Sequence, residues 1–252
     1  MVSRRRITAL AAGLTAGGAL SACGLAPLAR DARTAGPSEP VPAPAPRLGE
    51  RWVYVETNRY TGEARRQLVL EVARLAPQLV VLRSDVDGRA LGRETYDRPW
   101  WIVDEPAYDI PIRFESPMPM LPEPIAPAAP RWYRTHYRAA GDSGRYAWEL
   151  GVSASGWERI RVPAGEYLCL RVERRIRFDH PDPFRIGSER TDILWYAPEL
   201  NRWVQREWTG EYQLPGRRPV FAPEDWIRWS LVSHTPPATM DRNRPQGTHD
   251  VR

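Results

Sequence analysis

The fold is decided by the stretch Trp157-Glu-Arg-Ile-Arg-Val-Pro-Ala-Gly-Glu-Tyr-Leu-Cys-Leu-Arg-Val-Glu-Arg-Arg-Ile-Arg-Phe178. Two runs of β-forming residues, 157–162 and 167–178, lie on either side of Pro163-Ala-Gly165. Proline and glycine favour a tight turn, and the apolar residues that flank it can then pair across it. The stretch therefore predicts an antiparallel β-hairpin.

Short strands separated by turn signals also fill the rest of the body. Turns are indicated at 61–62, 85–88, 141–142, 155–156, 182–183 and 198. A helical period is not sustained over any useful window, and the strongest helix candidate, Pro223–Trp226, is one turn at most. Regular punctuation of this kind favours an antiparallel sheet. The strands expected besides the hairpin are 52–58, 67–74, 79–82, 89–96, 100–103, 131–139, 146–154, 191–196, 203–212 and 226–233.

We therefore predict an all-β domain, built as an antiparallel curved sheet or an open half β-barrel. Residues 106–130 are rich in proline, and we expect them to form an irregular segment that packs on the sheet. Arg51-Trp52 and Arg131-Trp132 each open a series of strands, so a domain of two related halves is an alternative organisation.

The N-terminus has the pattern of an export signal. Arginines at 4–6 precede a run of small and apolar residues over 9–22, which ends at Cys23. A charged region, an apolar region and a small-residue cleavage site are typical of a signal peptide. The apolar run is shorter than the roughly 20 residues that cross a bilayer, so a permanent anchor is the weaker interpretation. Ser3-Arg4-Arg5 fits a twin-arginine signal as well as an ordinary positive region.

Leu20-Ser21-Ala22-Cys23 resembles the lipobox of bacterial lipoprotein signal peptides. The resemblance implies that Cys23 becomes the first residue, that palmitate-type chains acylate its sulfur, and that the mature protein is anchored to a membrane. Two or more chains give stable anchoring. In bacteria with two membranes, Gly24 in place of Asp implies the outer membrane, with the protein facing the periplasm.

Four parts are expected along the chain. Residues 1–22 form the signal peptide, and 23–46 form the lipidated cysteine with a Pro/Ala-rich linker, expected to be extended and disordered. Residues 47–233 form the β domain, which is long enough for one sizeable core. Residues 234–252 are polar and are predicted to form a disordered tail.

The charge of the chain does not favour nucleic acid as a partner. The formal net charge is +5, and all the basic residues are Arg. Loss of the three arginines at 4–6 with the signal peptide leaves about +2. Nucleic-acid binding requires clustered positive charge, whereas Arg here alternates with Asp and Glu, as on a solvated sheet face.

Motifs for catalysis or metal binding are weak. Cys169 lies in an apolar strand without a nearby His, so we expect a buried, inert thiol. Gly151–Gly156 lacks the glycine that a nucleophile elbow needs at position 155. Asp179–Asp182 is more typical of a hairpin loop than of a metal site, and Asp85–Gly88 of a β-turn than of a calcium loop. We predict no catalytic residue, metal or cofactor.

Aromatic residues are the most distinctive feature of the body. The chain has 11 Trp, 10 Tyr and 4 Phe, and many fall in predicted strands. Filling of the core of a large curved sheet is the simpler interpretation. The functional interpretation is that some of them line a concave apolar groove for an acyl chain, or a platform for a sugar or peptide. The candidates for this groove are Trp100, Trp101, Trp132, Trp148, Trp195 and Trp203.

Val162-Pro-Ala-Gly-Glu-Tyr167, Leu170-Arg-Val-Glu173 and Trp195-Tyr-Ala-Pro198 together resemble a pattern of poorly characterised β-rich periplasmic proteins. The resemblance covers roughly residues 130–212 and implies a fold, not a reaction. By analogy of fold, such proteins resemble the curved half-barrels of lipoprotein carriers and receptors.

The combined signals predict a non-enzymatic envelope lipoprotein that binds a lipid, acyl chain or lipoprotein on an apolar concave face. The alternative is a scaffold or assembly module that binds another envelope protein through a sheet edge or aromatic patch. An envelope hydrolase is the third interpretation, and it requires acidic and His residues that converge in one cleft. The expected partners are a membrane, through the lipid anchor, and a lipid or envelope protein.

Overall fold

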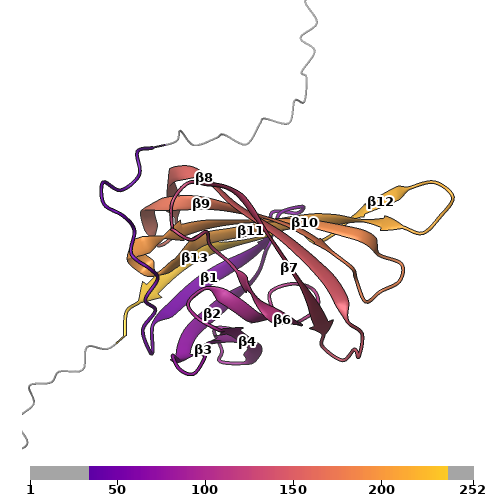
Figure 1. Ribbon diagram of the computed structural model, residues 1–252. Helices are drawn as coiled ribbons and strands as arrows, with labels where there is room; N and C mark the ends of the chain where they lie inside the picture. The colour runs from indigo at the N-terminus through magenta and orange to yellow at the C-terminus, as the bar shows by residue number, and fades with distance from the viewer. Residues whose placement is uncertain (1–33, 238–252) are drawn as a thin grey trace, which may run out of the picture. The chain divides into compact units, whose positions relative to one another are not determined.

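The computed structural model describes residues 34–237 (Figure 1). The signal peptide, Cys23 and the tail from residue 238 lie outside the described residues. Within the described part, no helix has the length and apolar character needed to cross a bilayer. The strands are β1 (Arg51–Asn58), β2 (Ala64–Arg74), β3 (Leu79–Ser84), β4 (Ala90–Tyr96), β5 (Trp101–Glu105), β6 (Ile112–Pro119), β7 (Ala128–Ala139), β8 (Tyr146–Val162), β9 (Gly165–Phe178), β10 (Ile186–Ala197), β11 (Arg202–Leu214), β12 (Val220–Pro223) and β13 (Ile227–Thr235).

Twelve of these strands close into a ring in which neighbours are antiparallel. The order follows the chain from β1 to β11, and β13 then pairs with both β11 and β1. Strand β12 lies outside the ring, paired with β11. The prediction of an all-β antiparallel domain is confirmed. The open half-barrel is wrong, because β13 hydrogen-bonds to both ends of the sheet and closes it.

The decisive hairpin forms as predicted, with one correction. Strands β8 and β9 pair continuously from Trp148↔Phe178 to Val162↔Gly165. The expected turn at 155–156 is a bulge within β8, where the register shifts between Ala154 and Gly156. Gly156 has φ of +144°, which favours glycine and lets the strand continue after the extra residue. The bulge makes β8 one long strand in place of the two expected.

The proline-rich segment 106–130 was expected to be irregular, but it contains β6 and the start of β7. Met118 and Pro119 pair with Ile102 and Trp101 at the end of β6. Proline is tolerated at such a position, where its missing N–H interrupts few ladder bonds. The predicted helix candidate at 223–226 is not helical, and the described helix is instead a single 3₁₀ turn, η1 (Pro198–Leu200). Arg51 opens β1 whereas Arg131 lies inside β7, which gives the two-halves alternative no support.

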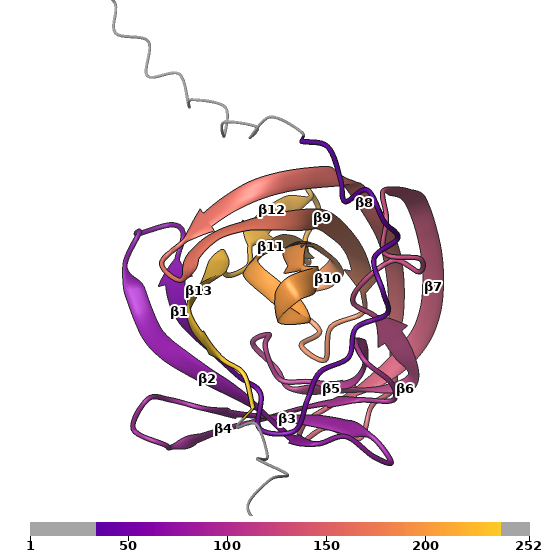
Figure 2. The ribbon, with the colours of Figure 1, turned by 90° about the vertical axis from the view of Figure 1, so that its left-hand side faces the viewer.

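The two ends of the ring close differently. At one end, the β8–β9 turn reaches β13, where the Ala164 amide donates to the Leu231 carbonyl at 3.1 Å. The β10–β11 turn, with η1, lies within the ring at this end, as the view along the barrel shows (Figure 2). Trp52 Nε1 donates to the Leu200 carbonyl at 3.2 Å and fixes the turn to β1. The other end, toward β12, is bounded by the β1–β2, β5–β6 and β9–β10 connections (Figure 1).

Charged residues cross the interior at the middle of the ring, where a sheet of this kind usually packs apolar side chains. We call this set the buried belt, and it contains four arginines and four carboxylates that are almost completely buried. The equal numbers leave the belt formally neutral. This balance matters because an unpaired buried charge is strongly destabilising. The members are Glu56, Arg83, Glu94, Glu105, Arg174, Asp192, Arg202 and Arg206.

Asp192 is the most highly connected member of the buried belt. Its carboxylate accepts hydrogen bonds from Arg174 at 2.6 Å, from Arg206 at 3.1 and 2.9 Å, and from the Tyr108 hydroxyl at 2.9 Å. Arg206 also donates to Glu105 on β5 at 3.1 Å, which joins opposite sides of the ring. A single carboxylate on β10 therefore connects β9, β11 and the β5–β6 connection.

The ionisation of the belt follows from these contacts. Burial opposes ionisation of Asp192, but Arg206, Arg174 and the Tyr108 hydroxyl outweigh it and hold the Asp192 pKa below its usual range. Burial and the nearby Asp192 raise the pKa of Tyr108 to about 12, so this phenol keeps the proton that it donates. Arg202 and Arg83 likewise overcome burial and lower the pKa of Glu94.

Replacement of Asp192 by Ala is expected to lower the free energy of unfolding by about 3–5 kcal/mol, because Arg174 and Arg206 would keep buried charge without their shared partner. Urea titration followed by tryptophan fluorescence measures this loss. The control is Glu189→Ala on the same strand, whose exposed pair with Arg177 is worth under about 1 kcal/mol. Equal effects of the two changes would contradict the role of the belt.

The lowered pKa of Asp192 also predicts a pH dependence of wild-type stability. The contribution of this carboxylate to the free energy of unfolding is present above pH ~4 and falls as the pH drops below it.

Candidate functional site

The six aromatic residues predicted to line one groove do not converge. Trp100, Trp148 and Trp203 are buried inside the ring, whereas Trp101 is half-buried at the end crossed by the N-terminal segment. Trp132 is 50% exposed, and Trp195 is half-buried beside Glu158, to which its Nε1 donates at 2.9 Å. Trp100 and Trp101 line one hollow together, whereas the other four candidates lie outside its lining. The physical reason is that closure of the sheet separates residues facing inward from those facing outward.

Interior tryptophans pack against the buried belt. The Arg202 guanidinium lies 4.2 Å from the Trp203 ring centroid and 4.9 Å from that of Trp100. Trp148 packs edge-to-face on Phe114, with ring centroids 5.0 Å apart. A cation over an aromatic face is favourable when both are desolvated. These aromatic residues therefore stabilise buried arginines, which the alternation of residues along the strands did not predict.

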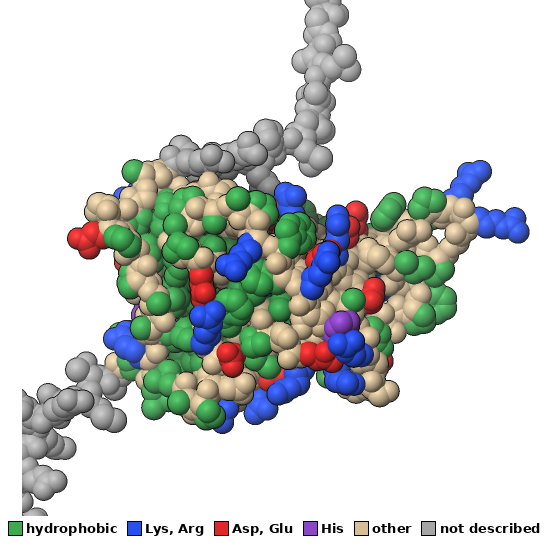
Figure 3. Space-filling model, viewed as in Figure 1, with side chains coloured by type: hydrophobic (Ala, Val, Ile, Leu, Met, Phe, Trp, Pro, Cys, Tyr) green, Lys and Arg blue, Asp and Glu red, His purple; other side chains and the backbone are tan. Residues whose placement is uncertain are grey.

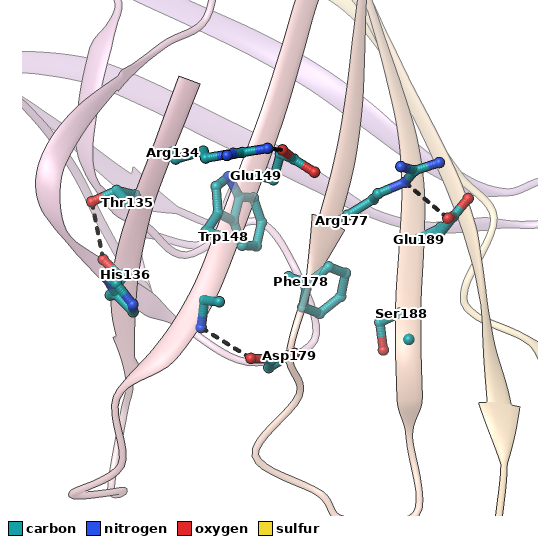
Figure 4. Close-up of a pocket in the computed structure, with 12 residues that line it drawn as sticks. Arg134, Thr135, His136, Trp148, Glu149, Arg177, Phe178, Asp179, Ser188 and Glu189 are labelled. Carbon is teal, nitrogen blue, oxygen red and sulfur yellow. Dashed lines mark hydrogen bonds and ion pairs between the residues drawn. The ribbon is translucent and has the colours of Figure 1, made fainter. Parts of the chain in front are cut away.

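The outer wall of β7–β10 carries a shallow depression of about 470 Å³ (Figure 4). Its rim is a row of opposite charges from neighbouring strands, in which Arg134 bonds to Glu149 at 2.7 Å and Arg177 to Glu189 at 3.0 Å. Acidic and basic side chains are scattered over the wall in the same way, and hydrophobic ones concentrate in the left half of the view (Figure 3). Paired, exposed charges of this type indicate a solvated face.

The N-terminal segment 34–48, which we call the strap, lies across one end of the barrel (Figure 2). It begins with an isolated bridge between Thr34 and Trp157 on β8. The Ala45 amide donates to Asn201 Oδ1 at 3.0 Å, and the Arg47 amide donates to Glu50 Oε2 at 2.9 Å. Residues 34–46 were expected to belong to a free linker, but they lie against the β domain.

An apolar hollow of about 390 Å³ lies beneath the strap. Strap residues form one wall, the residues before β5 form the second, and the connection between β6 and β7 forms the third. The volume falls within the range of about 300–1,000 Å³ that is usual for small-ligand sites. The principal apolar lining residues are Val41, Pro44, Trp100, Trp101, Leu121 and Ile125.

The rim of the hollow is held by a polar cluster around Trp101. Its Nε1 donates to Glu123 Oε1 at 2.8 Å, and Arg98 donates to the other oxygen of the same carboxylate at 3.2 Å. The Arg98 guanidinium lies 4.2 Å from the Trp101 ring centroid. The cluster joins the β4–β5 and β6–β7 connections and holds the Trp101 side chain at the entrance.

Trp100 lies at the bottom of the hollow in an unusual backbone conformation. Its φ is +61°, which is rare for a bulky residue and costs on the order of 1–3 kcal/mol. The ring packs edge-to-face on Tyr96 and Trp203, at 5.1 and 5.4 Å between centroids. Its buried indole N–H has no hydrogen-bond partner among the described residues. Trp100 therefore combines backbone strain with an unused donor at the edge of an apolar space.

The other sequence candidates are placed as follows. Cys23 lies outside the described residues. Cys169 is buried, and burial raises its thiol pKa well above the usual range, so the thiolate is disfavoured. Residues 85–88 form a turn closed by the Arg89 amide on Asp85, and Asp179–Asp182 lies in the β9–β10 connection. Residues 34–237 contain no cluster of three or more His, Cys, Asp or Glu side chains suited to a metal.

The sequence does not predict the strap hollow, because its walls lie in segments that are typical of a linker and of a crossing loop. One signal was present. Val41 interrupts an otherwise small and proline-rich run, and Leu121 and Ile125 occur between prolines. An isolated apolar residue in such a segment indicates a docking point, because a free linker gains nothing from it.

Two solved structures are similar to this chain at low sequence identity. No family model matches the chain, and no curated protein matches it significantly. A protein of Parabacteroides distasonis, provisionally described as a lipoprotein, is 15% identical with a TM-score of 0.48, over 75% of this chain and 96% of that one. A protein of Bacteroides fragilis, provisionally described as exported and with a YmcC-like fold, is also 15% identical with a TM-score of 0.48. That match covers 78% of this chain and 100% of the other.

The docking of the strap can be tested at Asn201, which has φ of +53° and accepts the Ala45 N–H. Asn201→Gly keeps this backbone conformation accessible and removes the amide acceptor. We expect faster hydrogen exchange in peptides covering the strap, with a loss of at most about 1.5 kcal/mol in the free energy of unfolding. Unchanged exchange over 34–48 would show that the hydrogen bond does not hold the strap.

Proposed function

We propose that the protein is an exported lipoprotein that is anchored through acylated Cys23 and binds an acyl chain in the strap hollow. The observation that supports this proposal is the apolar hollow itself, closed by the segment that leads from Cys23. We propose a binding role without catalysis, and the outer membrane as the location in a bacterium with two membranes.

The chemistry of the hollow suits a hydrocarbon chain with a polar end. Transfer of each CH₂ group from water into an apolar site is favourable by about 0.8 kcal/mol. The unpartnered N–H of Trp100 offers a donor for a carboxyl or ester oxygen. The aromatic and proline walls are rigid, so ordering them costs little entropy.

The small number of residues between Cys23 and Thr34 favours access of the hollow to the bilayer. Thr34, the first described residue, follows Cys23 closely in the sequence. The intervening chain spans at most roughly 40 Å when fully extended. An anchor at Cys23 therefore restricts the distance between the membrane surface and the start of the strap, which is the end of the barrel where the hollow lies.

Lipidation is tested by feeding alkyne-palmitate to a bacterial host that expresses the full chain. Cys23→Ser is expected to abolish labelling and membrane association, because it removes the acylated sulfur. Cys169→Ala is the matched control, since it removes the other cysteine, and it should retain both. Label that persists in Cys23→Ser would contradict the assignment.

Acyl binding is tested with a photoreactive fatty acid supplied to the same host, followed by mapping of the labelled peptides. We expect labels on the strap and on 98–101 or 121–125. Ala43→Trp, which adds a large side chain to a residue lining the hollow, should reduce labelling at least fivefold. Ala35→Trp adds the same side chain to an exposed strap residue outside the lining and should not. Labels scattered over the outer wall would argue against a dedicated site.

One observation favours the scaffold alternative. The β11–β12 hairpin projects from the ring (Figure 1) and exposes Leu214, Val220 and Phe221, the last of which is 60% exposed. Strand β12 pairs on one side with β11, so its other edge is available for strand addition. This surface suits another envelope protein and does not compete with the hollow.

A further inference from the structure

A second pocket, of about 490 Å³, lies at the end of the barrel opposite the strap. We call it the mouth. It is formed by the end of β1, the start of β2, the β5–β6 and β9–β10 connections, and the segment that follows β12. Four arginines and four carboxylates contribute to its lining, so it differs completely from the apolar hollow. It lies directly above Tyr108, whose hydroxyl bonds to Asp192 of the buried belt.

Glu224 is a buried residue of the mouth, and hydrogen bonds hold both its side chain and its backbone. Its side chain is only 5% exposed, and Oε2 accepts from Arg190 Nε at 2.8 Å. Its backbone amide donates to the Gly210 carbonyl at 2.8 Å, and its carbonyl accepts from the Tyr60 hydroxyl at 3.1 Å. A Cβ at Gly210 would lie 2.5 Å from Glu224 Oε2, so glycine at this position makes room for the carboxylate.

The second oxygen of this carboxylate is not used by the protein. Glu224 Oε1 is buried and has no hydrogen-bond partner among residues 34–237. Arg185 NH1 lies 3.9 Å from Oε1, too far for a hydrogen bond, and instead donates to Asp109 Oδ2 at 2.7 Å. A buried, unpaired carboxylate oxygen is costly and requires a donor.

Neighbouring charges show which kind of donor is favoured. Asp109 shares both arginines with Glu224, because Arg190 NH2 lies 3.6 Å from Asp109 Oδ1. Burial and the charge of Asp109 raise the pKa of Glu224, despite Arg190 and Arg185. Arg190 is fixed over the Tyr108 ring at 4.0 Å and cannot move to cover Oε1 without losing that contact. Both arginines near Glu224 are thus shared with Asp109, and neither donates a hydrogen bond to Oε1.

We propose that the mouth binds a small ligand that carries an ammonium group, and that Glu224 Oε1 accepts a hydrogen bond from it. An ammonium ion supplies the missing donor, and its charge adds to that of the two arginines that Glu224 shares with Asp109. At the rim, the half-exposed Arg65 and Arg66 pair with Asp225 at 3.3 Å and with Glu56 at 3.1 Å. The site is independent of the proposed acyl binding, since it lies at the other end of the barrel.

The test uses the full-length lipidated protein, with thermal unfolding measured at constant ionic strength in ethanolammonium, tetramethylammonium or sodium chloride. We expect ethanolammonium to raise the melting temperature, because it binds the folded state. Tetramethylammonium has the charge but no N–H, so it should act like sodium. Glu224→Gln should weaken ethanolammonium binding at least tenfold. Glu211→Gln, an exposed carboxylate next to the β11–β12 pairing and outside the lining, should not.

A pH series on the wild-type protein tests the proposal even where Glu224→Gln fails to fold. Binding requires ionised Glu224, and its raised pKa means that affinity should fall as the pH drops through that value. Asp109 stays ionised there, because His180, Arg190 and Arg185 lower its pKa against the effect of burial. His180 also faces this cluster, 3.7 Å from Asp109, so the series is repeated with His180→Gln and should keep its shape.

Several outcomes would overturn the proposal. These are equal stabilisation by ethanolammonium and tetramethylammonium, equal stabilisation by neutral ethylene glycol, and undiminished binding in folded Glu224→Gln. A pH dependence that disappears in His180→Gln would also overturn it. Photoreactive fatty acid labelling should be unchanged in Glu224→Gln, so failure here is distinguishable from failure of the acyl-binding proposal.

Discussion

The shared contact of Asp192 with Arg174 and Arg206 is the constraint on which the rest of the structure depends. Closing a sheet of twelve strands encloses more space than aliphatic side chains from short strands can fill. This chain fills it with long arginines, tryptophans and tyrosines, and it must then neutralise every buried charge. Because Arg206 reaches Glu105 on the opposite side, neutralisation also sets which strands face each other across the ring.

The buried belt also determines where ligands can bind. An acyl chain cannot lie along the axis of the barrel, because it would separate paired charges and leave them unsolvated. The apolar hollow lies instead at the end of the barrel where the strap adds a wall that the sheet does not provide. At the opposite end, Glu56 of the belt and Tyr108, which bonds to Asp192, line the mouth together with other charged residues.

Local sequence pattern predicted the strands well and the closure poorly. The 157–178 hairpin follows from turn residues and β-forming runs, which are local signals. The bulge at Gly156 and a turn at the same residues have the same local signature, and only the pairing of β9 along the whole of β8 distinguishes them. Closure depends on β13 meeting β1, a contact between residues far apart in the sequence, on which local periodicity carries no information.

One sequence signal for the buried belt was available. Leu170, Val172, Ile176 and Phe178 share one face of β9, and Arg174 lies among them on that face. An arginine on an apolar face requires a buried partner. Arg174 therefore differs from the arginines that alternate with Glu on a solvated face, although the simple alternation of Arg and Glu does not distinguish them. Cys23 is different, because the role predicted for it depends on a processing enzyme and a membrane, and it lies outside the described residues.

The arrangement of the two ends has a consequence for any ligand exchange at the membrane. With the anchor that we propose at Cys23, the strap would join the membrane to the hollow, so movement of the barrel relative to the bilayer would act on the strap first. The mouth lies at the other end of the barrel, and the buried belt crosses the interior between the two ends. The charged site is therefore expected to respond to solutes in the aqueous compartment, while the apolar site responds to the bilayer.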